Sequence, residues 1–159
     1  MNGTLARQLT DSYAECIEGH SGIVDLGAGY RKWGRRQEPY LGVDLEGDDA
    51  NLRVDMRDVD EWMKHANGHD TVVLMDSLEH LTLEDGLALL CRIENIFRVV
   101  VVFSPDGYVK NAEYTGLQEH LSGWTPEMLE ERGYETIGLW PGFHGPPIPS
   151  GAFLSRYER

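Results

Sequence analysis

The sequence predicts an α/β protein built on a mostly parallel sheet of seven strands, with helices packed on both faces. Two observations carry this prediction. Short apolar runs that do not alternate with polar residues recur along the chain, as expected for strands buried on both faces. Segments with helical spacing lie between several of these runs, which is the order that produces a three-layer α/β/α sandwich. A length of 159 residues favours one domain spanning residues 1–159.

Seven segments are predicted as strands, and their connections set the direction of the last one. They are residues 22–27, 40–45, 52–56, 71–76, 98–104, 134–140 and 151–158. Only a proline-rich loop joins the last two, which predicts a hairpin and therefore an antiparallel final strand. Gly34 and Pro39 limit the first connection to one or two helical turns, so we expect a shortened first crossover helix.

Three helices are predicted from apolar spacing and capping residues. The first lies near the N-terminus, and its apolar stripe is Leu5, Leu9, Tyr13, Cys16 and Ile17. The second begins after the N-cap Thr82. Its apolar residues are Leu87, Leu90, Cys91 and Ile93. The third, "TPEMLEERG", combines a capping threonine, a proline at the first helical position and a terminal glycine.

Charge and composition narrow the expected partners. The chain has 14 Lys and Arg against 27 Asp and Glu, a formal net charge of −13. Because affinity for a phosphate backbone comes mostly from basic side chains, we expect no nucleic-acid partner, and we expect the basic cluster 31–36 to be solvated surface. No apolar run is long enough to span a bilayer, so no membrane partner is expected. The widely separated Cys16 and Cys91 indicate a reduced, cytoplasmic protein, while nothing in the sequence indicates an oligomeric state.

Two alternating glycines follow the first predicted strand, in "SGIVDLGAGYRKWG". A dinucleotide-binding loop would carry a third glycine near Arg31, and there is none. Asp25 would also oppose the doubly charged pyrophosphate of a dinucleotide. We therefore expect a loop for a different ligand, in which Gly27 and Gly29 let the backbone approach closely.

Four predicted strands end in an aspartate: Asp25, Asp44, Asp55 and Asp76. Ligands of an open parallel sheet bind beyond the carboxyl ends of its strands, so four carboxylates are expected around one crevice. Any single one is better explained as a turn or cap residue, whereas the whole set favours a ligand site. Carboxylates favour a cationic ligand such as S-adenosylmethionine, which carries a sulfonium and an ammonium.

The segments "VDLGAG", "LGVDLEG", "VDMRD" and "LMDSLEHL" stand in an order that resembles the successive motifs of class I S-adenosylmethionine-dependent methyltransferases. The closest resemblance is to the ubiquinone-methyltransferase-like group, called type 11. "VVVVFSPDG" and "EHLSGWTPEMLEERGYETIGLW" are similar to later segments of that group. The resemblance implies a Rossmann-like fold, S-adenosylmethionine as cofactor, and methyl transfer.

The resemblance also implies a cofactor site. Contacts to the methionine part of the cofactor would come from Asp25, Gly27 and Gly29. Tyr30, the next residue, is also expected at the methionine end, where it would either cover the cofactor or leave it half open. Asp76 and Ser77 would lie on the sulfonium side.

The adenosine end of the cofactor would be held by two other segments. Asp44 would accept hydrogen bonds from both ribose hydroxyls, with Leu45 beside the adenine. Asp55 would take the adenine amine, and together with Met56 it would frame the ring.

Methyl transfer is an in-line displacement that requires alignment of nucleophile and methyl group, with a general base only where the nucleophile must lose a proton. His120 is the first candidate for that base, His80 the second and His144 the third; the alternative for each is a capping or surface histidine. The irregular segments 104–124 and 142–151 are expected to cover the acceptor. Aromatic residues from these segments would form its floor: Tyr108, Tyr114, Trp124 and Phe143. The alternative for Trp124 is a buried position ahead of its helix.

No metal site is expected. His65 and His69 flank an Asn-Gly turn signal, and "DSLEH" departs from the zinc-binding pattern HExxH.

The predicted function is transfer of a methyl group from S-adenosylmethionine to an O, N or C nucleophile of a small-molecule acceptor. A non-catalytic S-adenosylmethionine-binding module, acting as a sensor or partner subunit, is the alternative. A nicotinamide-dependent oxidoreductase is disfavoured, since the sequence has neither GxGxxG nor a Tyr-x-x-x-Lys pair.

Overall fold

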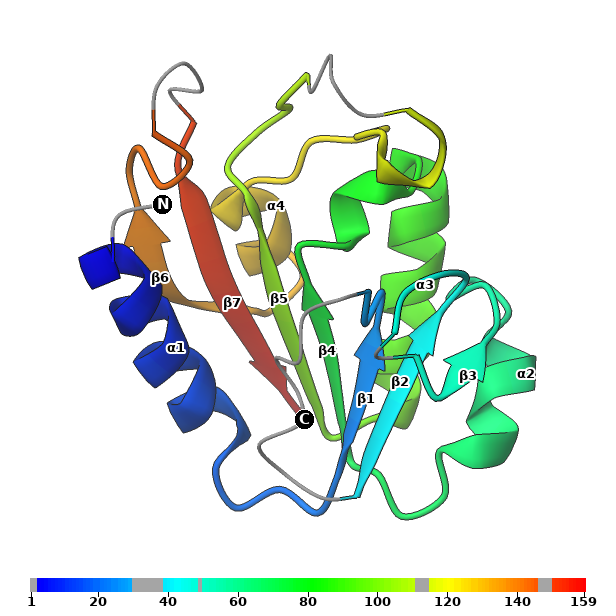
Figure 1. Cartoon of the computed structure of the whole chain (residues 1–159). Coiled ribbons are helices and arrows are strands. Elements are labelled where there is room, and N and C mark those ends of the chain that lie inside the picture. The colour runs from blue at the N-terminus through cyan, green and yellow to red at the C-terminus, as the bar shows by residue number, and fades with distance from the viewer. Residues whose placement is uncertain (1–2, 30–38, 49, 111–114, 146–149) are drawn as a thin grey trace.

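A seven-stranded sheet forms the centre of the computed structural model, which describes residues 3–29, 39–48, 50–110, 115–145 and 150–159. The strands are β1 (Ile23–Leu26), β2 (Tyr40–Asp44), β3 (Leu52–Arg53), β4 (Thr71–Met75), β5 (Val99–Pro105), β6 (Glu135–Trp140) and β7 (Ala152–Glu158). Their order across the sheet is β3-β2-β1-β4-β5-β7-β6 (Figure 1).

The directions of the strands agree with the prediction. All pairings among β1 to β5 are parallel, whereas β7 runs antiparallel between β5 and β6. The parallel strands β1, β4 and β5 are buried on both faces, which explains their continuous apolar runs. The predicted Rossmann-like α/β/α sandwich with an antiparallel last strand is confirmed.

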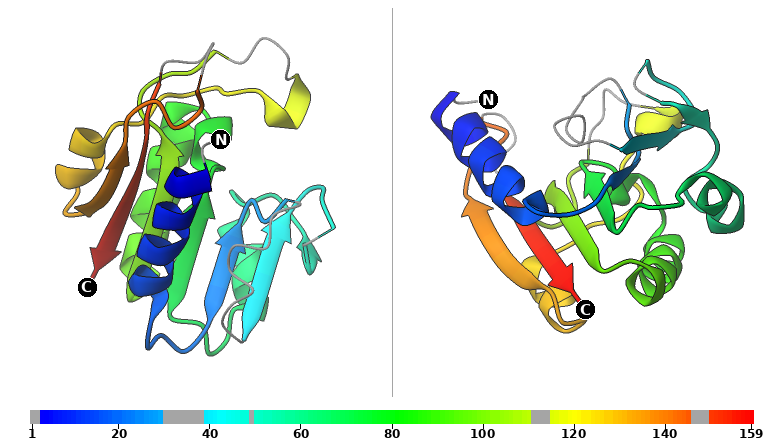
Figure 2. Two further views of the ribbon diagram at one scale, coloured as in Figure 1. Left: turned by 60° about the vertical axis from the view of Figure 1, so that its left-hand side comes forward. Right: turned by 90° about the horizontal axis from the view of Figure 1, so that it is seen from below.

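Helices cover the two faces unequally (Figure 2). The helix α1 (Gly3–Ile17) lies on one face, over a core that includes Leu9, Tyr13 and Phe103. The other face carries α2 (Val59–Trp62), α3 (Leu83–Ile96) and α4 (Pro126–Glu130) over the larger core cluster. The predicted shortened crossover helix falls in 30–38, outside the described residues.

Local signals set the starts of α3 and α4 as predicted. The hydroxyl of Thr82 accepts a hydrogen bond from the Asp85 amide, and that of Thr125 accepts one from the Met128 amide. The stripe predicted for α3 is wrong at Cys91, which is exposed. The helix instead buries Gly86, Leu89, Leu90 and Ile93.

The third strand is shorter than predicted, and α2 was not predicted. Asp55 ends the strand segment early because its carboxylate accepts the Arg57 amide in a tight turn. The chain then enters α2, a helix of four residues that is too short to show a helical period. Trp62 anchors it in the core and donates to the Met56 carbonyl at 2.9 Å. Within the described parts of the chain, no helix has the length and apolar character needed to cross a membrane.

Candidate functional site

A cleft of about 720 Å³ opens at the carboxyl ends of β1, β2 and β4. Its walls also include the segment before α3, residues 116–118 and 120–121, and His144. The carboxyl ends of parallel strands meet at one edge of the sheet, which is where ligands of such sheets bind. The volume is in the range of clefts that hold small molecules and cofactors.

Most of the predicted site residues lie together in this cleft. Its lining includes Gly27, Gly29, Asp44, Leu45, Asp55, Met56, Asp76, Ser77, His80 and His120. Tyr30 lies outside the described residues. Asp25 is buried behind the cleft rather than lining it, and its Oδ2 accepts a hydrogen bond of 3.1 Å from the Tyr40 hydroxyl. The ends of the four predicted strands therefore converge on the cleft, although the Asp25 carboxylate does not face it.

Both the backbone conformation and the neighbouring atoms favour glycine at position 27. Its φ of +79° lies in the left-handed region, and a Cβ atom there would be 2.4 Å from the Cβ of Ser77. The Ser77 hydroxyl donates to the Leu26 carbonyl at 2.8 Å. The glycine therefore lets the turn after β4 pack directly against the turn after β1.

Asp44 holds the loops after β1 and β2 together. Its Oδ2 accepts the Gly29 amide at 2.8 Å, and its Oδ1 accepts the Glu46 amide at 2.9 Å. A Cβ atom at Gly47 would be 2.3 Å from the Gly29 carbonyl oxygen, so the two loops touch. Asp44 thus shapes the loop that ends at Gly29, and it also lines the cleft.

Arg57 forms an ion-pair group at the rim of the cleft that sequence reasoning missed. Its guanidinium binds the Asp55 carboxylate, with Nη2 at 2.6 Å from Oδ2, and also reaches Asp85 at 3.2 Å. Hydrogen bonding from Arg57 holds the pKa of Asp55 below its usual value. Asp55 therefore already has donors on both carboxylate oxygens.

Asp76 adopts a backbone conformation that L-residues rarely take. Its φ is +62°, and it is the one non-glycine residue with positive φ in the described parts of the chain. Its amide donates to the Phe103 carbonyl at 2.9 Å. Such strain is found preferentially at functional sites, and here it places a carboxylate in the cleft.

Glu79 is a fully buried carboxyl that sequence reasoning also missed. Its side chain is 1% exposed, and burial, together with the neighbouring Asp76 carboxylate, raises its pKa well above the usual value. Oε2 lies 3.4 Å from the Ser104 hydroxyl, while Oε1 accepts no hydrogen bond from any described residue. The 3-10 turn Leu78–His80 directs Glu79 inward and His80 toward the cleft, a distinction that sequence spacing does not reveal.

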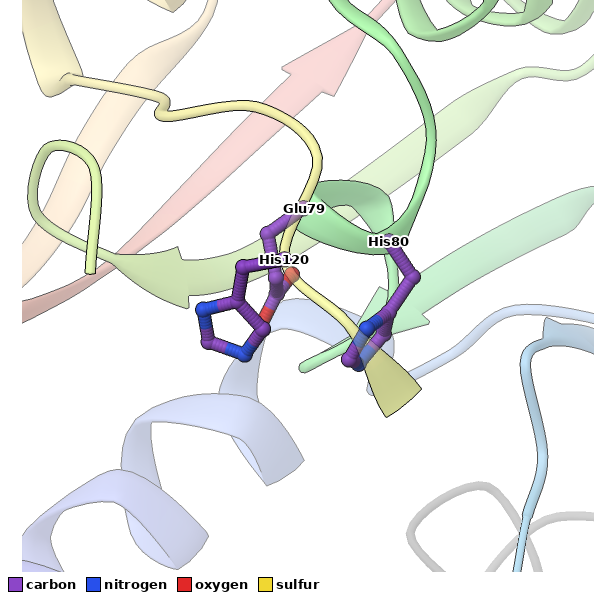
Figure 3. A group of neighbouring side chains, drawn as sticks. All are labelled: Glu79, His80 and His120. Atoms are coloured by element: carbon purple, nitrogen blue, oxygen red, sulfur yellow. The ribbon is translucent and has the colours of Figure 1, made fainter. Parts of the chain in front are cut away.

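All three candidate histidines line the cleft. The rings of His80 and His120 meet edge to face with centroids 5.0 Å apart (Figure 3). Nδ1 of His80 is 3.1 Å from the Glu119 carbonyl oxygen. Burial lowers the pKa of His120, and the neighbouring His80 lowers it further, so His120 is neutral at pH 7.

The predicted aromatic floor is wrong for the residues that can be placed. Trp124 is fully buried and donates to the Ser122 hydroxyl at 2.9 Å, in line with the alternative of a buried position. Phe143 packs against Phe103 in the core. Tyr108 is exposed and does not line the cleft, and Tyr114 lies outside the described residues. We call the part of the cleft lined by His80, Val109, Leu117, His120, Leu121 and His144 the acceptor side, because most of these residues come from the segments expected to cover an acceptor.

The charges of the cleft are predominantly negative. Its described lining contains Asp44, Glu46, Asp55, Asp76 and Asp85. Arg57 is the one Lys or Arg among those lining residues, and its charge is matched by Asp55 and Asp85. This field opposes a pyrophosphate and favours a ligand with positive charge.

No protein-family model and no curated protein matches this chain. Solved structures match it over its whole length. The small RNA methyltransferase HEN1 is 15% identical to this chain, with a TM-score of 0.66. The match covers 100% of this chain but only 26% of HEN1. The N-terminal domain of EvdMO1 with SAH bound has 14% identity and a TM-score of 0.63, covering 95% of this chain and 79% of that chain. The N-methyltransferase NodS from Bradyrhizobium japonicum WM9 has 9% identity and a TM-score of 0.68, and the match covers 99% of this chain and 98% of NodS.

Identities this low show the fold alone. The fold is that of class I S-adenosylmethionine-dependent methyltransferases, and SAH, the product that S-adenosylmethionine leaves, is bound in a solved structure of this fold. The narrower resemblance to the type 11 group is not confirmed.

The expectation of no nucleic-acid partner is wrong, because RNA methyltransferases, HEN1 among them, share this fold. Net charge sums the whole surface, whereas contact with RNA uses one face. A nucleic-acid acceptor is thus compatible with this fold. The single domain and the cytoplasmic location stay predictions.

Proposed function

We propose that this chain transfers a methyl group from S-adenosylmethionine to an O, N or C nucleophile. The observation that carries the proposal is the acidic cleft at the strand ends of a methyltransferase fold, with the glycine turn after β1 at one side. S-adenosylmethionine has two cationic groups and one carboxylate, so it suits a cleft in which carboxylates outnumber cationic side chains.

Asp44 is the residue we assign to the ribose. It lies at the end of β2, and each of its oxygens accepts one backbone amide, which leaves lone pairs for the ribose hydroxyls. Leu45 follows it as an exposed apolar side chain in the cleft, suited to cover one face of the adenine.

The other cofactor contacts follow the same edge of the sheet. Gly27, Gly29, Asp76 and Ser77 line the part of the cleft beside β1 and β4, so we assign them to the methionine half. Asp55 and Met56 are assigned to the adenine, and the amine would share Asp55 with Arg57. Asp25 is assigned an indirect role through Tyr40 and the start of the loop.

The transfer itself breaks the carbon–sulfur bond of the sulfonium and forms a bond between the methyl carbon and the acceptor. The electrons of the new bond come from a lone pair of the acceptor, and the electron pair of the broken bond returns to sulfur. Where the acceptor must lose a proton, His120 is the candidate base because its lowered pKa keeps an imidazole lone pair available at pH 7.

Calorimetry with S-adenosylmethionine, S-adenosylhomocysteine and NAD tests the cofactor. We expect both sulfur ligands to bind and NAD to bind far more weakly. Asp44→Ala should weaken S-adenosylmethionine binding by roughly 1.5–3 kcal/mol, the range for a hydrogen bond to a charged group. Asp11→Ala, an exposed aspartate on α1, is the matched control and should bind as the unaltered chain does. Binding of NAD alone would contradict the proposal.

Turnover separates an enzyme from a non-catalytic binding module. The full chain is incubated with methyl-labelled S-adenosylmethionine and two acceptor pools, one of total RNA and one of small metabolites. We expect label in one pool, reduced by His120→Ala. Tight cofactor binding with no label in either pool would favour the binding module.

A further inference from the structure

Two histidines that line the acceptor side of the cleft and the buried Glu79 beside them have the geometry of a cation site (Figure 3). Glu79, His80 and His120 each offer one ligand atom, and these atoms all lie within 4.8 Å of one another. Two residues come from the turn after β4 and one from the segment before α4, so the fold brings them together from 40 positions apart in sequence. An ion at their centre would draw the three ligand atoms inward to normal metal–ligand distances.

The buried carboxyl of Glu79 gives the first reason to place a cation there. A buried carboxyl can hold its charged form only where a cation or several donors compensate that charge. Oε1 has no hydrogen-bond donor among the described residues, and the Ser104 hydroxyl is a distant donor to Oε2. Arg57 is already paired with Asp55 and Asp85, so no described basic side chain of the cleft is left to neutralise Glu79.

The histidines have lone pairs available for a cation. Nδ1 of His80 faces the Glu119 carbonyl oxygen, which only accepts, so Nδ1 carries the hydrogen and Nε2 carries the lone pair. A carbonyl that fixes the tautomer in this way is the usual outer partner of a metal-binding histidine. Nδ1 of His120 is buried and has no hydrogen-bond partner among the described residues, so its lone pair is open to an ion.

The backbone holds these ligands in place independently of any ion. The Glu79 carbonyl accepts the amides of Leu121 and Ser122 at 2.8 and 3.1 Å. These bonds fix the segment that carries His120 against the turn that carries Glu79 and His80. A prearranged ligand set of this kind lowers the conformational cost of binding.

We propose that Glu79, His80 and His120 bind one divalent transition-metal ion on the acceptor side of the cleft. Two imidazoles and one carboxylate suit Mn²⁺, Fe²⁺, Co²⁺ or Zn²⁺, whereas Mg²⁺ prefers oxygen ligands alone. Three protein ligands leave coordination positions open. Asp76, whose strained backbone places its carboxylate next to Glu79, adds negative charge to the site. The sequence pattern predicted no metal here, because the ligands do not form a contiguous motif.

The role of the ion in catalysis rests on the proposed methyl transfer. An acceptor hydroxyl bound to the ion loses its proton to water more readily, because the cation stabilises the oxyanion. The oxygen then attacks the methyl carbon, and the electron pair of the carbon–sulfur bond returns to sulfur. In this arrangement both histidines act as ligands, and the ion replaces His120 in the role of general base that the ion-free site would give it.

Binding of Co²⁺ and Mn²⁺ to the full chain, after treatment with a chelator, tests the site without the cofactor. We expect one ion per chain by calorimetry and, for Co²⁺, a visible absorption spectrum that reports nitrogen ligands. Glu79→Gln, His80→Ala and His120→Ala should each weaken binding by at least about tenfold, since loss of even an outer partner costs that much. His65→Ala, an exposed histidine beyond the cleft, is the matched control and should bind normally.

Two results would overturn the site: no binding to the unaltered chain, or unchanged binding in all three variants. Thermal unfolding of each variant confirms that it folds. Glu79→Gln replaces a buried group, so if that variant does not fold, the variants at the partly buried His80 and His120 decide the question. Failure of the site and failure of the proposed function are distinguishable. Ion binding without S-adenosylmethionine binding contradicts the methyltransferase alone, and ion-independent turnover by a chain that binds no ion contradicts the metal site alone.

Discussion

Ser77 occupies the space that any side chain at position 27 would need, with 2.4 Å between its Cβ and a Cβ built on Gly27. The turn after β4 and the turn after β1 are therefore packed against each other at the bottom of the cleft. The Ser77 hydroxyl strengthens this contact through its 2.8 Å hydrogen bond to the Leu26 carbonyl.

Gly27→Ala should therefore destabilise the fold through a steric clash as well as through backbone strain. Gly68→Ala is the matched control, because Gly68 has a similar φ of +85° and no atom within 4 Å of its Cβ position. We expect Gly27→Ala to lower the free energy of unfolding by about 1–3 kcal/mol more than Gly68→Ala, as overpacking does. Urea denaturation measures the difference. Equal losses in the two variants would show that Ser77 yields without cost.

Gly86→Ala should destabilise α3 despite the higher helix propensity of alanine. A Cβ at position 86 would lie 2.5 Å from Cζ2 of the buried Trp124. On an exposed helix the same change stabilises by about 1 kcal/mol. In a Trp124→Leu background, which removes the indole ring, Gly86→Ala should cost less, and a double-mutant cycle in urea measures the coupling. No coupling would contradict the contact.

The two cysteines should differ in reactivity. Cys91 is exposed on α3, whereas burial raises the pKa of the Cys16 thiol to about 11. A thiol-specific reagent at pH 8 should label one cysteine in the native chain and both in denaturant. Labelling of Cys16 in the native chain would contradict its burial.

The raised pKa of Cys16 also has a consequence for stability at high pH. The thiol of the unfolded chain ionises near its ordinary pKa of 9.0, whereas the native thiol resists ionisation up to about 11. The contribution of Cys16 to stability is therefore full below pH 9 and is lost as the pH rises toward 11. The free energy of unfolding should fall more steeply over this window in the unaltered chain than in Cys16→Ala. Parallel pH profiles would contradict the shift.

Arg57→Gln should remove a small electrostatic stabilisation at the rim of the cleft. Arg57 lowers the pKa of Asp55 below 3.8, so the pair contributes above pH 3.8 and the contribution is lost as the pH falls through the lowered pKa. Because Arg57 is half exposed, we expect a loss at pH 7 of at most about 1 kcal/mol, decreasing in acid. Arg7→Gln, exposed on α1, is the control. A loss that does not change with pH would indicate packing rather than charge.

Much of the fold follows from the sequence because its strands are buried on both faces. Runs such as Val99–Phe103 have no other stable environment in a chain of this size, and the aspartates that end the strands necessarily meet at one edge. The length of β3 and the presence of α2 depend on the turn at Asp55, which periodicity does not reveal.

The site was less predictable than the fold, because the direction in which each side chain points from a turn decides whether it lines the cleft. Glu79 and His80 are neighbours in the sequence, yet one is buried and the other faces the cleft. Asp25 reads like the other strand-end aspartates, but its position within β1 directs it to Tyr40. The net charge of the chain could not exclude a nucleic-acid partner, because a sum over all residues does not show how charge is distributed on any one face of the protein.

The pair of amides that bind the Glu79 carbonyl has a consequence for how this site can change in evolution. The loop that carries His120 is anchored through main-chain atoms, which every residue type possesses. Substitutions at positions 80 and 120 therefore leave the hydrogen bonds between the two segments in place. Single side chains in this part of the cleft can therefore be exchanged while the backbone that presents them keeps its hydrogen bonds.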